Sequence, residues 1–97
     1  MKTKKPKLPH IVVHQMKGRS GKEVPNQLVI YADNGRLFQS YRTVIAFIDN
    51  NGKVYLDLEK WDYSTTTGKY RNIFLNEDKR TTEGKIKSGE YTLVNLN

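Results

Sequence analysis

Apolar and polar residues alternate with a period of two through most of the first 60 positions, a pattern typical of β-strands that bury one face. The alternation predicts a first strand over 10–16. The next stretch, 17–26, is rich in Gly, Ser, Pro and charge, and it predicts a mobile loop. The first strand is therefore expected between two flexible segments, 1–9 and 17–26.

Two Asn-Gly pairs, the strongest short-range hairpin signal, predict two hairpins. These hairpins join 27–32 to 36–39 across Asn34-Gly35, and 43–49 to 53–59 across Asn51-Gly52. A two-residue loop in the second hairpin sets Phe47 opposite Leu56 and Ile48 opposite Tyr55. One face is then fully apolar and is assigned to the core: Ile45, Phe47, Val54, Leu56 and Leu58. The other face is mixed: Val44, Ala46, Ile48, Tyr55 and Asp57.

The alternation ends after Trp61, where the pattern becomes helical. Hydroxyl residues at 64–67 are suitable helix N-caps, and apolar side chains follow at helical spacing, so the sequence predicts a helix over 65–75. A second, shorter helix is expected from Thr81 or Thr82 to about Ser88, with Gly89 as its stop. A last strand is expected over 90–96.

These elements predict an α+β fold: an antiparallel, curved or barrel-like sheet of five to six strands, with one or two short helices before the last strand. Residues 10–97 are expected to form one domain. Residues 1–9, with four lysines and two prolines, are expected to be a disordered basic arm.

Charge changes this picture, because the net charge of +7 is accounted for by the first 22 residues. The seven basic residues before the first acid are Lys2, Lys4, Lys5, Lys7, Lys17, Arg19 and Lys22. From Glu23 onward the chain has ten basic and ten acidic residues. A basic segment on a neutral domain indicates a polyanionic partner.

The leading interpretation is a small non-catalytic protein that binds nucleic acid, DNA rather than RNA, through phosphate contacts. Lysine outnumbers arginine six to one before Glu23, and lysine is a mobile point charge, so the arm is expected to tether rather than to read a sequence. A solubilising tail is the simpler alternative. The expected contact residues are Lys2, Lys4, Lys5, Lys7, Lys17, Arg19, Lys22, Arg42, Ser64, Thr66, Thr67, Lys69, Tyr70 and Arg71.

The last six of these contacts lie around the start of the first predicted helix. Free backbone N–H groups and the helix dipole favour an anion at such a start, and hydroxyls, Lys69 and Arg71 add donors. The simpler alternative is that the hydroxyls cap the helix and the aromatic rings pack it on the sheet. Base stacking on exposed aromatics is a further option, with Tyr31 and Phe38 expected as cross-strand partners.

The same region resembles a stretch found in a known protein family. The stretch YSTTTGKYRNIFL at 63–75, followed by IKSGEYTLV at 86–94, resembles a family of small uncharacterised proteins from phages and mobile elements. Those proteins share a Tyr-Ser-x-Thr-Thr run, a basic and aromatic helix ending in Phe-Leu, and a Lys-x-Gly-Glu-Tyr strand entry. The resemblance covers 40–95 and departs from the family pattern at Gly68. It implies a phage or plasmid context and no established activity.

Catalysis is not expected, because the chain has no phosphate-cradling glycine motif and no nucleophile–base signature. No cofactor is expected, and His10 and His14 lack a carboxylate at metal-ligand spacing. The chain has no cysteine, no secretory signal and no apolar run of about 18 residues, so we expect a soluble cytoplasmic protein without a membrane partner.

Two other classes of function stay open. The chain is alternatively an inhibitor or interaction protein that binds a host enzyme or defence complex through the Trp61–Tyr70 surface. A structural virion component is the third reading, and it predicts an oligomer formed through exposed strand edges, with a homodimer as one option.

Overall fold

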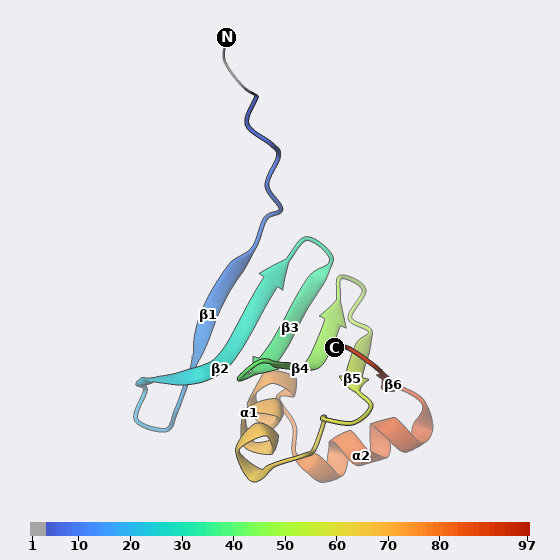
Figure 1. Ribbon diagram of the computed structural model, residues 1–97. Coiled ribbons are helices and arrows are strands. Elements are labelled where there is room, and N and C mark those ends of the chain that lie inside the picture. The colour runs from blue at the N-terminus through green and yellow to red at the C-terminus, as the bar shows by residue number, and fades with distance from the viewer. Residues whose placement is uncertain (1–3) are drawn as a thin grey trace.

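The computed structural model describes residues 4–97, which form a six-stranded sheet and two helices (Figure 1). The strands are β1 (Val12–Lys17), β2 (Glu23–Ala32), β3 (Gly35–Ser40), β4 (Thr43–Asp49), β5 (Val54–Asp57) and β6 (Thr92–Val94). The helices are α1 (Thr65–Leu75) and α2 (Lys79–Ser88), both between β5 and β6. The α+β class and the placement of two short helices before the last strand are confirmed.

The strands lie in sequence order across the sheet, β1-β2-β3-β4-β5-β6. The first five form an antiparallel meander, and β6 pairs with β5 in parallel. The sheet is therefore mixed rather than purely antiparallel, and it is open rather than closed into a barrel. The reason is the connection: α1 and α2 carry the chain back to the start of β5, so β6 runs in the direction of β5.

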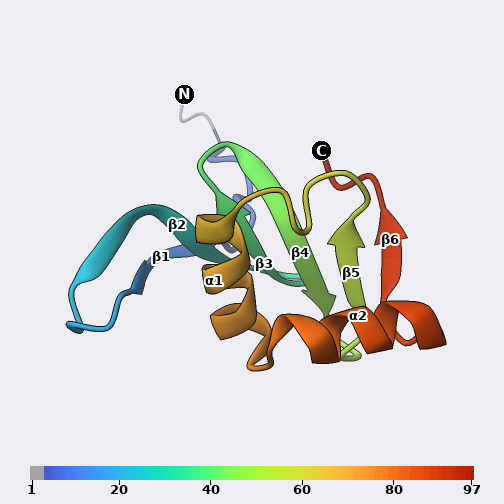
Figure 2. The same cartoon turned by 90° about the horizontal axis from the view of Figure 1, so that it is seen from below.

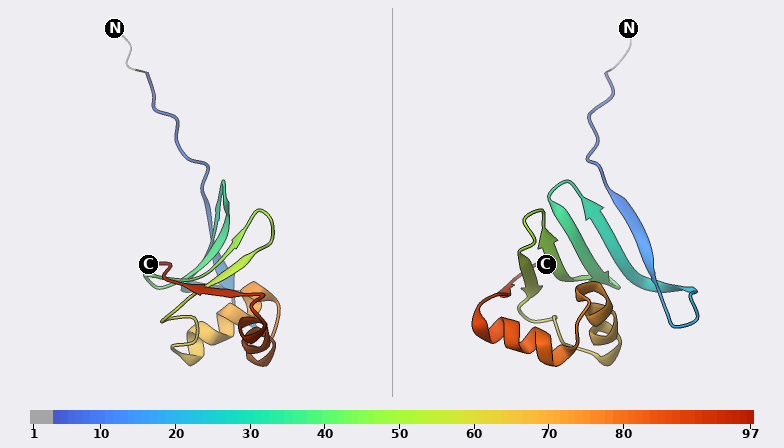
Figure 3. Two further views of the ribbon diagram at one scale, coloured as in Figure 1. Left: turned by 90° about the vertical axis from the view of Figure 1, so that its right-hand side faces the viewer. Right: turned by 180° about the vertical axis from the view of Figure 1, so that it is seen from behind.

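Both helices lie on the same side of the curved sheet (Figures 2 and 3). On α1, the Phe74 ring packs 5.9 Å from the ring of the fully buried Phe38, centroid to centroid. Tyr70 of the same helix joins this core. The buried apolar residues are Met16, Phe38, Ile45, Ala46, Ile48, Val54, Leu56, Tyr70 and Tyr91.

The predicted register of the β4–β5 hairpin is wrong by one residue. The loop has three residues, Asn50 to Gly52, and is closed by a hydrogen bond from the Asp49 N–H to the Lys53 carbonyl (3.0 Å). Gly52 takes a left-handed conformation (φ 84°), as the third position of such a loop requires. The Asp49 carboxylate accepts hydrogen bonds from two backbone N–H groups of the turn, which favours the longer loop.

This register changes which side chains reach the core. The observed pairs are Ala46 with Leu56, Phe47 with Tyr55, and Ile48 with Val54. Of the five predicted core residues, Ile45, Val54 and Leu56 are buried, whereas Phe47 is only half-buried and Leu58 is 56% exposed. Ala46, Ile48 and Asp57, assigned to the mixed face, are buried instead.

The first hairpin also differs from the expected pairing. Ala32 pairs with Gly35, so the loop residues are Asp33 and Asn34, and Tyr31 lies opposite Arg36 rather than Phe38. Gly35 is required there, because a Cβ atom at this position would collide with the Ile48 carbonyl oxygen. The predicted loop at 17–26 is shorter than expected, since β2 already begins at Glu23, which pairs with Lys17.

The helix boundaries agree closely with the sequence pattern. Helix α1 spans 65–75 as predicted, with Ser64 as N-cap, and its side chain accepts a hydrogen bond from the Thr67 N–H. Helix α2 ends at Ser88 with Gly89 in the left-handed conformation, as predicted. It begins earlier than expected, because Asp78 rather than a threonine is its N-cap.

Two carboxylates, those of Asp57 and Glu77, hold segments of the second half of the chain together through hydrogen bonds. Asp57 accepts hydrogen bonds from the N–H groups of Glu59, Lys60 and Leu96 and from the Asn97 side chain. Burial raises the pKa of Asp57, but these hydrogen bonds outweigh it and hold the pKa below its ordinary value. Asp57 thus anchors the chain after β6 to the end of β5.

Glu77 has the same role between α2 and the entry to β6. Its carboxylate accepts hydrogen bonds from Thr82 (2.6 Å), Lys85 (2.8 Å) and the Tyr91 hydroxyl (2.8 Å). Burial raises the pKa of Glu77, and these donors lower it further than burial raises it. Both carboxylates are therefore charged and fully engaged near neutral pH.

Candidate nucleic-acid interface

The basic residues before Glu23 fall into two clusters at opposite ends of β1. Lys4, Lys5 and Lys7 are exposed and lie outside any helix or strand, on a segment that extends away from the sheet (Figure 1). Lys2 lies outside the described residues. We call residues 4–11 the arm. That residues 1–9 are disordered stays a prediction.

The second cluster is the tip of the β1–β2 hairpin, formed by Lys17, Arg19 and Lys22, all exposed. The tip is a tight turn: the Gly18 N–H donates to the Lys22 carbonyl, and the Gly21 N–H donates to the Gly18 carbonyl, both at 3.0 Å. Because β1 has six residues, the end of the arm at residue 11 and the tip are separated by about 20 Å, and the arm lysines lie further away still. The turn fixes the direction in which the three cationic side chains leave the sheet.

Helix α1 meets the hairpin tip through Tyr70. A Cβ atom built at Gly18 would lie 3.8 Å from the Tyr70 hydroxyl. The Lys69 ammonium lies 5.5 Å from the centre of the Tyr70 ring, on the exposed side of the helix. Arg42 is exposed in the β3–β4 turn, next to Tyr41, whose N–H donates to the Asn26 carbonyl of β2. The structure thus brings one helix cation close to the tip.

Three of the predicted contact residues on α1 are buried. Thr67 is hydrogen-bonded to Ser40 (3.0 Å) beneath the helix, and Tyr70 is part of the core. Arg71 is 1% exposed, and its guanidinium donates to the Trp61 carbonyl (2.7 Å), to Asp62 (3.0 Å) and to the Asn72 side chain. These side chains are engaged in intramolecular contacts, as the simpler capping-and-packing alternative describes.

The start of α1 borders a groove of about 600 Å³, and the Asp62 side chain lies among the cationic residues that line it. Asp62 pairs with Arg71 at 3.0 Å and with Lys79 at 2.7 Å. Burial raises the pKa of Asp62, but these two cations outweigh it and hold the pKa below its ordinary value. Ser64 is the N-cap, and Thr66 is exposed. Asp62 thus neutralises one of the two cations that it pairs with at this helix start.

Two aromatic rings lie together on the sheet face that the helices leave uncovered. Phe47 and Tyr55 are cross-strand neighbours with ring centres 6.1 Å apart, both half-buried. The Lys53 ammonium lies 5.0 Å from the centre of the Tyr55 ring. Sequence reasoning placed Phe47 in the core and therefore missed this pair.

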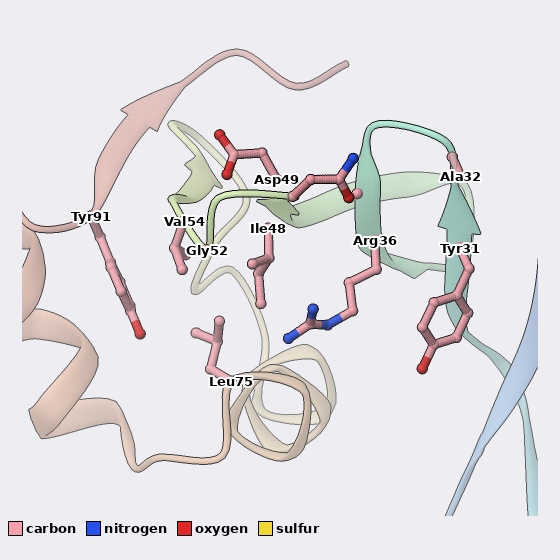
Figure 4. Close-up of a pocket in the computed structure, with 11 residues that line it drawn as sticks. Tyr31, Ala32, Arg36, Ile48, Asp49, Gly52, Val54, Leu75 and Tyr91 are labelled. Atoms are coloured by element: carbon pink, nitrogen blue, oxygen red, sulfur yellow. The ribbon is translucent and has the colours of Figure 1, made fainter.

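A second groove, of about 450 Å³, lies on the helix side of the sheet (Figure 4). The Arg36 side chain points into it between Ile48 and Leu75, with Tyr31 on one side and Tyr91 on the other. Arg36 is exposed and takes part in no ion pair within residues 4–97. The two-residue Asp33-Asn34 loop places Arg36 opposite Tyr31, a position where the sequence predicts Phe38.

The histidines lie apart from one another. His10 is in the arm, whereas His14 is in β1 and packs edge-to-face on Tyr31 with ring centres 5.8 Å apart. In the part of the chain that the structure describes, no group of three or more His, Cys, Asp or Glu residues could hold a metal ion. Likewise, no helix within residues 4–97 is long and apolar enough to cross a membrane.

Comparison with known proteins gives a family but no function. No curated protein and no solved structure matches the chain. A family model matches residues 12–90, a range that includes the hairpin tip, the 63–75 stretch and the lining of both grooves except Tyr91, but not the arm. Since the match covers most of the sequence, the chain belongs to the family of unknown function DUF8033.

Proposed function

We propose that this chain is a small non-catalytic nucleic-acid-binding protein, encoded by a phage or related mobile element, that acts on DNA in the host cytoplasm. The observation that carries the proposal is the state of the basic residues before Glu23. The six that the structure describes, Lys4, Lys5, Lys7, Lys17, Arg19 and Lys22, are all exposed, and none is in an ion pair within residues 4–97. The resemblance at 63–75 and 86–94 supports the phage context.

The spacing of the two clusters sets how much nucleic acid they reach. Lys7 of the arm is ten residues before Lys17 of the tip, so an extended chain separates them by up to about 34 Å. A duplex advances about 3.4 Å per phosphate along each strand, so the two clusters can contact points about ten base pairs apart. Lysine predominates, which favours a mobile, sequence-independent contact over bidentate recognition. The arm and tip therefore supply affinity rather than sequence preference.

Lys69 extends this surface beyond the tip, since it is exposed and its neighbour Tyr70 contacts the tip at Gly18. Arg42 is exposed too, but it lies beside Glu59 and Lys60, so it is expected to add a separate phosphate contact. The start of α1 contributes less, because Arg71 is buried and both Arg71 and Lys79 are paired with Asp62 there. The binding surface therefore follows one edge of the sheet, from the arm along β1 to the tip.

A salt titration tests the proposal. Binding of the intact chain to duplex DNA, single-stranded DNA and RNA is measured by fluorescence anisotropy at several salt concentrations. Each phosphate contact adds about 0.9 to the slope of log K against log salt on a duplex, so five to six contacts give a slope of about −5. Neutralising Lys4, Lys5 and Lys7 to Gln is expected to reduce this slope by about 2 to 3.

The matched control neutralises three exposed cations elsewhere: Lys60, Arg80 and Lys87, each to Gln. Both variants lose the same net charge, so a general charge effect would change them equally. The proposal predicts that only the arm variant loses about half of the slope. Equal slopes in the two variants, or no binding by the intact chain at low salt, would contradict it.

A host protein partner is the second candidate, and one observation favours it. Four apolar side chains are exposed where the arm joins β1. Their exposed fractions are 66% for Leu8, 54% for Ile11, 40% for Val12 and 53% for Val13. Exposed apolar patches are typical of protein–protein contacts. A pull-down from host lysate with nuclease treatment separates the candidates, since retention of one defined protein supports this one and loss of all material supports nucleic acid.

A further inference from the structure

One row of cross-strand neighbours connects the end of the arm to the groove shown in Figure 4. Val12 pairs with Tyr31, Tyr31 with Arg36, Arg36 with Ile48, and Ile48 with Val54, so the row crosses β1 to β5. Neighbouring strands lie about 4.8 Å apart, so the arm leaves the sheet about 10 Å from Arg36. Lys7 is five residues before Val12 and can reach across the groove, since an extended chain spans about 3.4 Å per residue.

The groove combines an apolar wall with the Arg36 cation, which is in no ion pair within residues 4–97. Asp49 also lines the groove, but its carboxylate accepts hydrogen bonds from two N–H groups of the β4–β5 turn. Ile48 and Val54 form a nearly buried floor, and Leu75 at the end of α1 closes it on the helix side. The Arg36 guanidinium points over this wall (Figure 4). Tyr31 is 47% exposed at the edge nearest the arm, with its ring held by the edge-to-face contact with His14.

We propose that this groove binds one unstacked nucleotide of a single strand. The phosphate pairs with Arg36, the base lies against Ile48 and Leu75, and the adjacent base stacks on Tyr31. Apolar wall, arginine and exposed aromatic ring are the combination with which proteins hold splayed-out bases. This inference rests on the proposed nucleic-acid binding and adds a preference for single strands to it.

The shape of the groove explains why a duplex would not enter. Paired bases are stacked inside the double helix, and only an unpaired strand presents a free ring to a groove of about 450 Å³. The arm and the tip, in contrast, contact phosphates that both forms carry. Removal of the Arg36 charge is therefore expected to affect the two forms differently.

The test compares Arg36→Gln with Arg80→Gln, which removes the same charge from an exposed position on α2, outside the proposed surface. Affinities for a 12-nucleotide single strand and for a duplex of the same length are measured by fluorescence anisotropy. Arg36→Gln is expected to weaken single-strand binding about tenfold, as for loss of a charged hydrogen bond, while duplex binding matches that of Arg80→Gln. Equal melting temperatures confirm that both variants are folded.

Each outcome decides a different claim. If the intact chain binds neither form, the proposed function fails and this inference fails with it. If the intact chain binds, but Arg36→Gln behaves like Arg80→Gln on both forms, the groove inference is overturned and the proposed function stands. Photocrosslinking with a strand that contains 5-iododeoxyuridine gives a second readout: attachment at Tyr31 supports the groove, and attachment at Tyr55 instead overturns it in favour of the uncovered face.

Discussion

The helix-covered part of the sheet, from β3 to β6, contains every ion pair found within residues 4–97, although some of its cations, such as Arg36, are unpaired there, whereas the described part of the arm and the β1–β2 hairpin contain none. Within residues 4–97, the four ion pairs all lie between Asp62 and Glu90. Strand β1 has one buried residue, Met16, while the fully buried Phe38, Ile45 and Leu56 all belong to β3–β5. The region from β3 to β6 therefore supplies most of the buried core, whereas the β1–β2 hairpin and the arm present exposed positive charge.

The largest expected difference between these regions concerns the core. Phe38→Ala removes a fully buried ring that packs on Phe74, and we expect a loss of about 4 kcal/mol in the free energy of unfolding. Val13→Ala, in the exposed hairpin, is expected to change it by less than about 0.5 kcal/mol. Urea denaturation measures both changes. A comparable loss in the two variants would contradict the claim that the core of β3 to β6 supplies most of the stability.

Arg71 tests whether the start of α1 belongs to the stable region or to the binding region. Arg71→Met leaves Asp62 without its buried partner and the Trp61 carbonyl without its donor, so we expect a loss of about 3 kcal/mol. DNA affinity of the folded variant is expected to match that of Arg80→Gln. Should affinity fall while stability is kept, the helix start would be a phosphate site after all.

Acid is expected to weaken the helix-covered part selectively, because the folded-state pKa values of Asp57, Asp62 and Glu77 are lowered. The unfolded chain then takes up protons first, so their contribution is present above about pH 4 and is lost as the pH falls through the lower folded-state values. We expect Asp57→Asn to cost about 2 kcal/mol at pH 7 and to reduce the loss of stability between pH 4 and pH 2.

The control for this experiment is Asp33→Asn in the exposed β2–β3 turn, measured by thermal unfolding over the same pH range. It is expected to leave both the stability at pH 7 and its pH dependence close to those of the intact chain. An unchanged pH profile in Asp57→Asn would show that the hydrogen bonds to Leu96 and Asn97 add little.

The smallest expected effect on stability belongs to the arm. Replacing Lys4, Lys5 and Lys7 by Gln is expected to change the free energy of unfolding by less than about 0.5 kcal/mol, because these side chains are exposed and form no ion pair with any residue of 4–97. Urea denaturation at low and high salt checks this. A clear loss of stability would mean that the arm packs on the domain.

Helix boundaries could be predicted from the sequence because they depend on local capping and spacing. Strand register was predicted less well because it depends on the length of each turn. Ser64 and the helical spacing of Tyr70 and Phe74 place α1 correctly, and Gly89 places the end of α2. The β4–β5 register could not be read from Asn51-Gly52 alone, because the Asp49 side chain stabilises a loop one residue longer.

The candidate site shows the same limit. The charge of the arm and the tip is visible in the sequence, since it depends only on composition. The groove depends on Tyr31, Arg36, Ile48 and Leu75 coming together from four elements, and no local signal reports that. Burial of Arg71 was equally hidden, because its partner Asp62 is nine residues away and reaches it only through the turn before α1.

The parallel pairing of β6 with β5 bears on the order in which the chain folds. Strands β1 to β5 are joined by short turns, so each can pair soon after its neighbour forms. Strand β6 can pair only after both helices have crossed from Asp57 to Thr92, and such non-local pairing is slow because loop closure comes first. We therefore expect the meander to form early and the β5 edge to stay open longest, so a newly synthesised chain would carry its basic hairpin before its domain is complete.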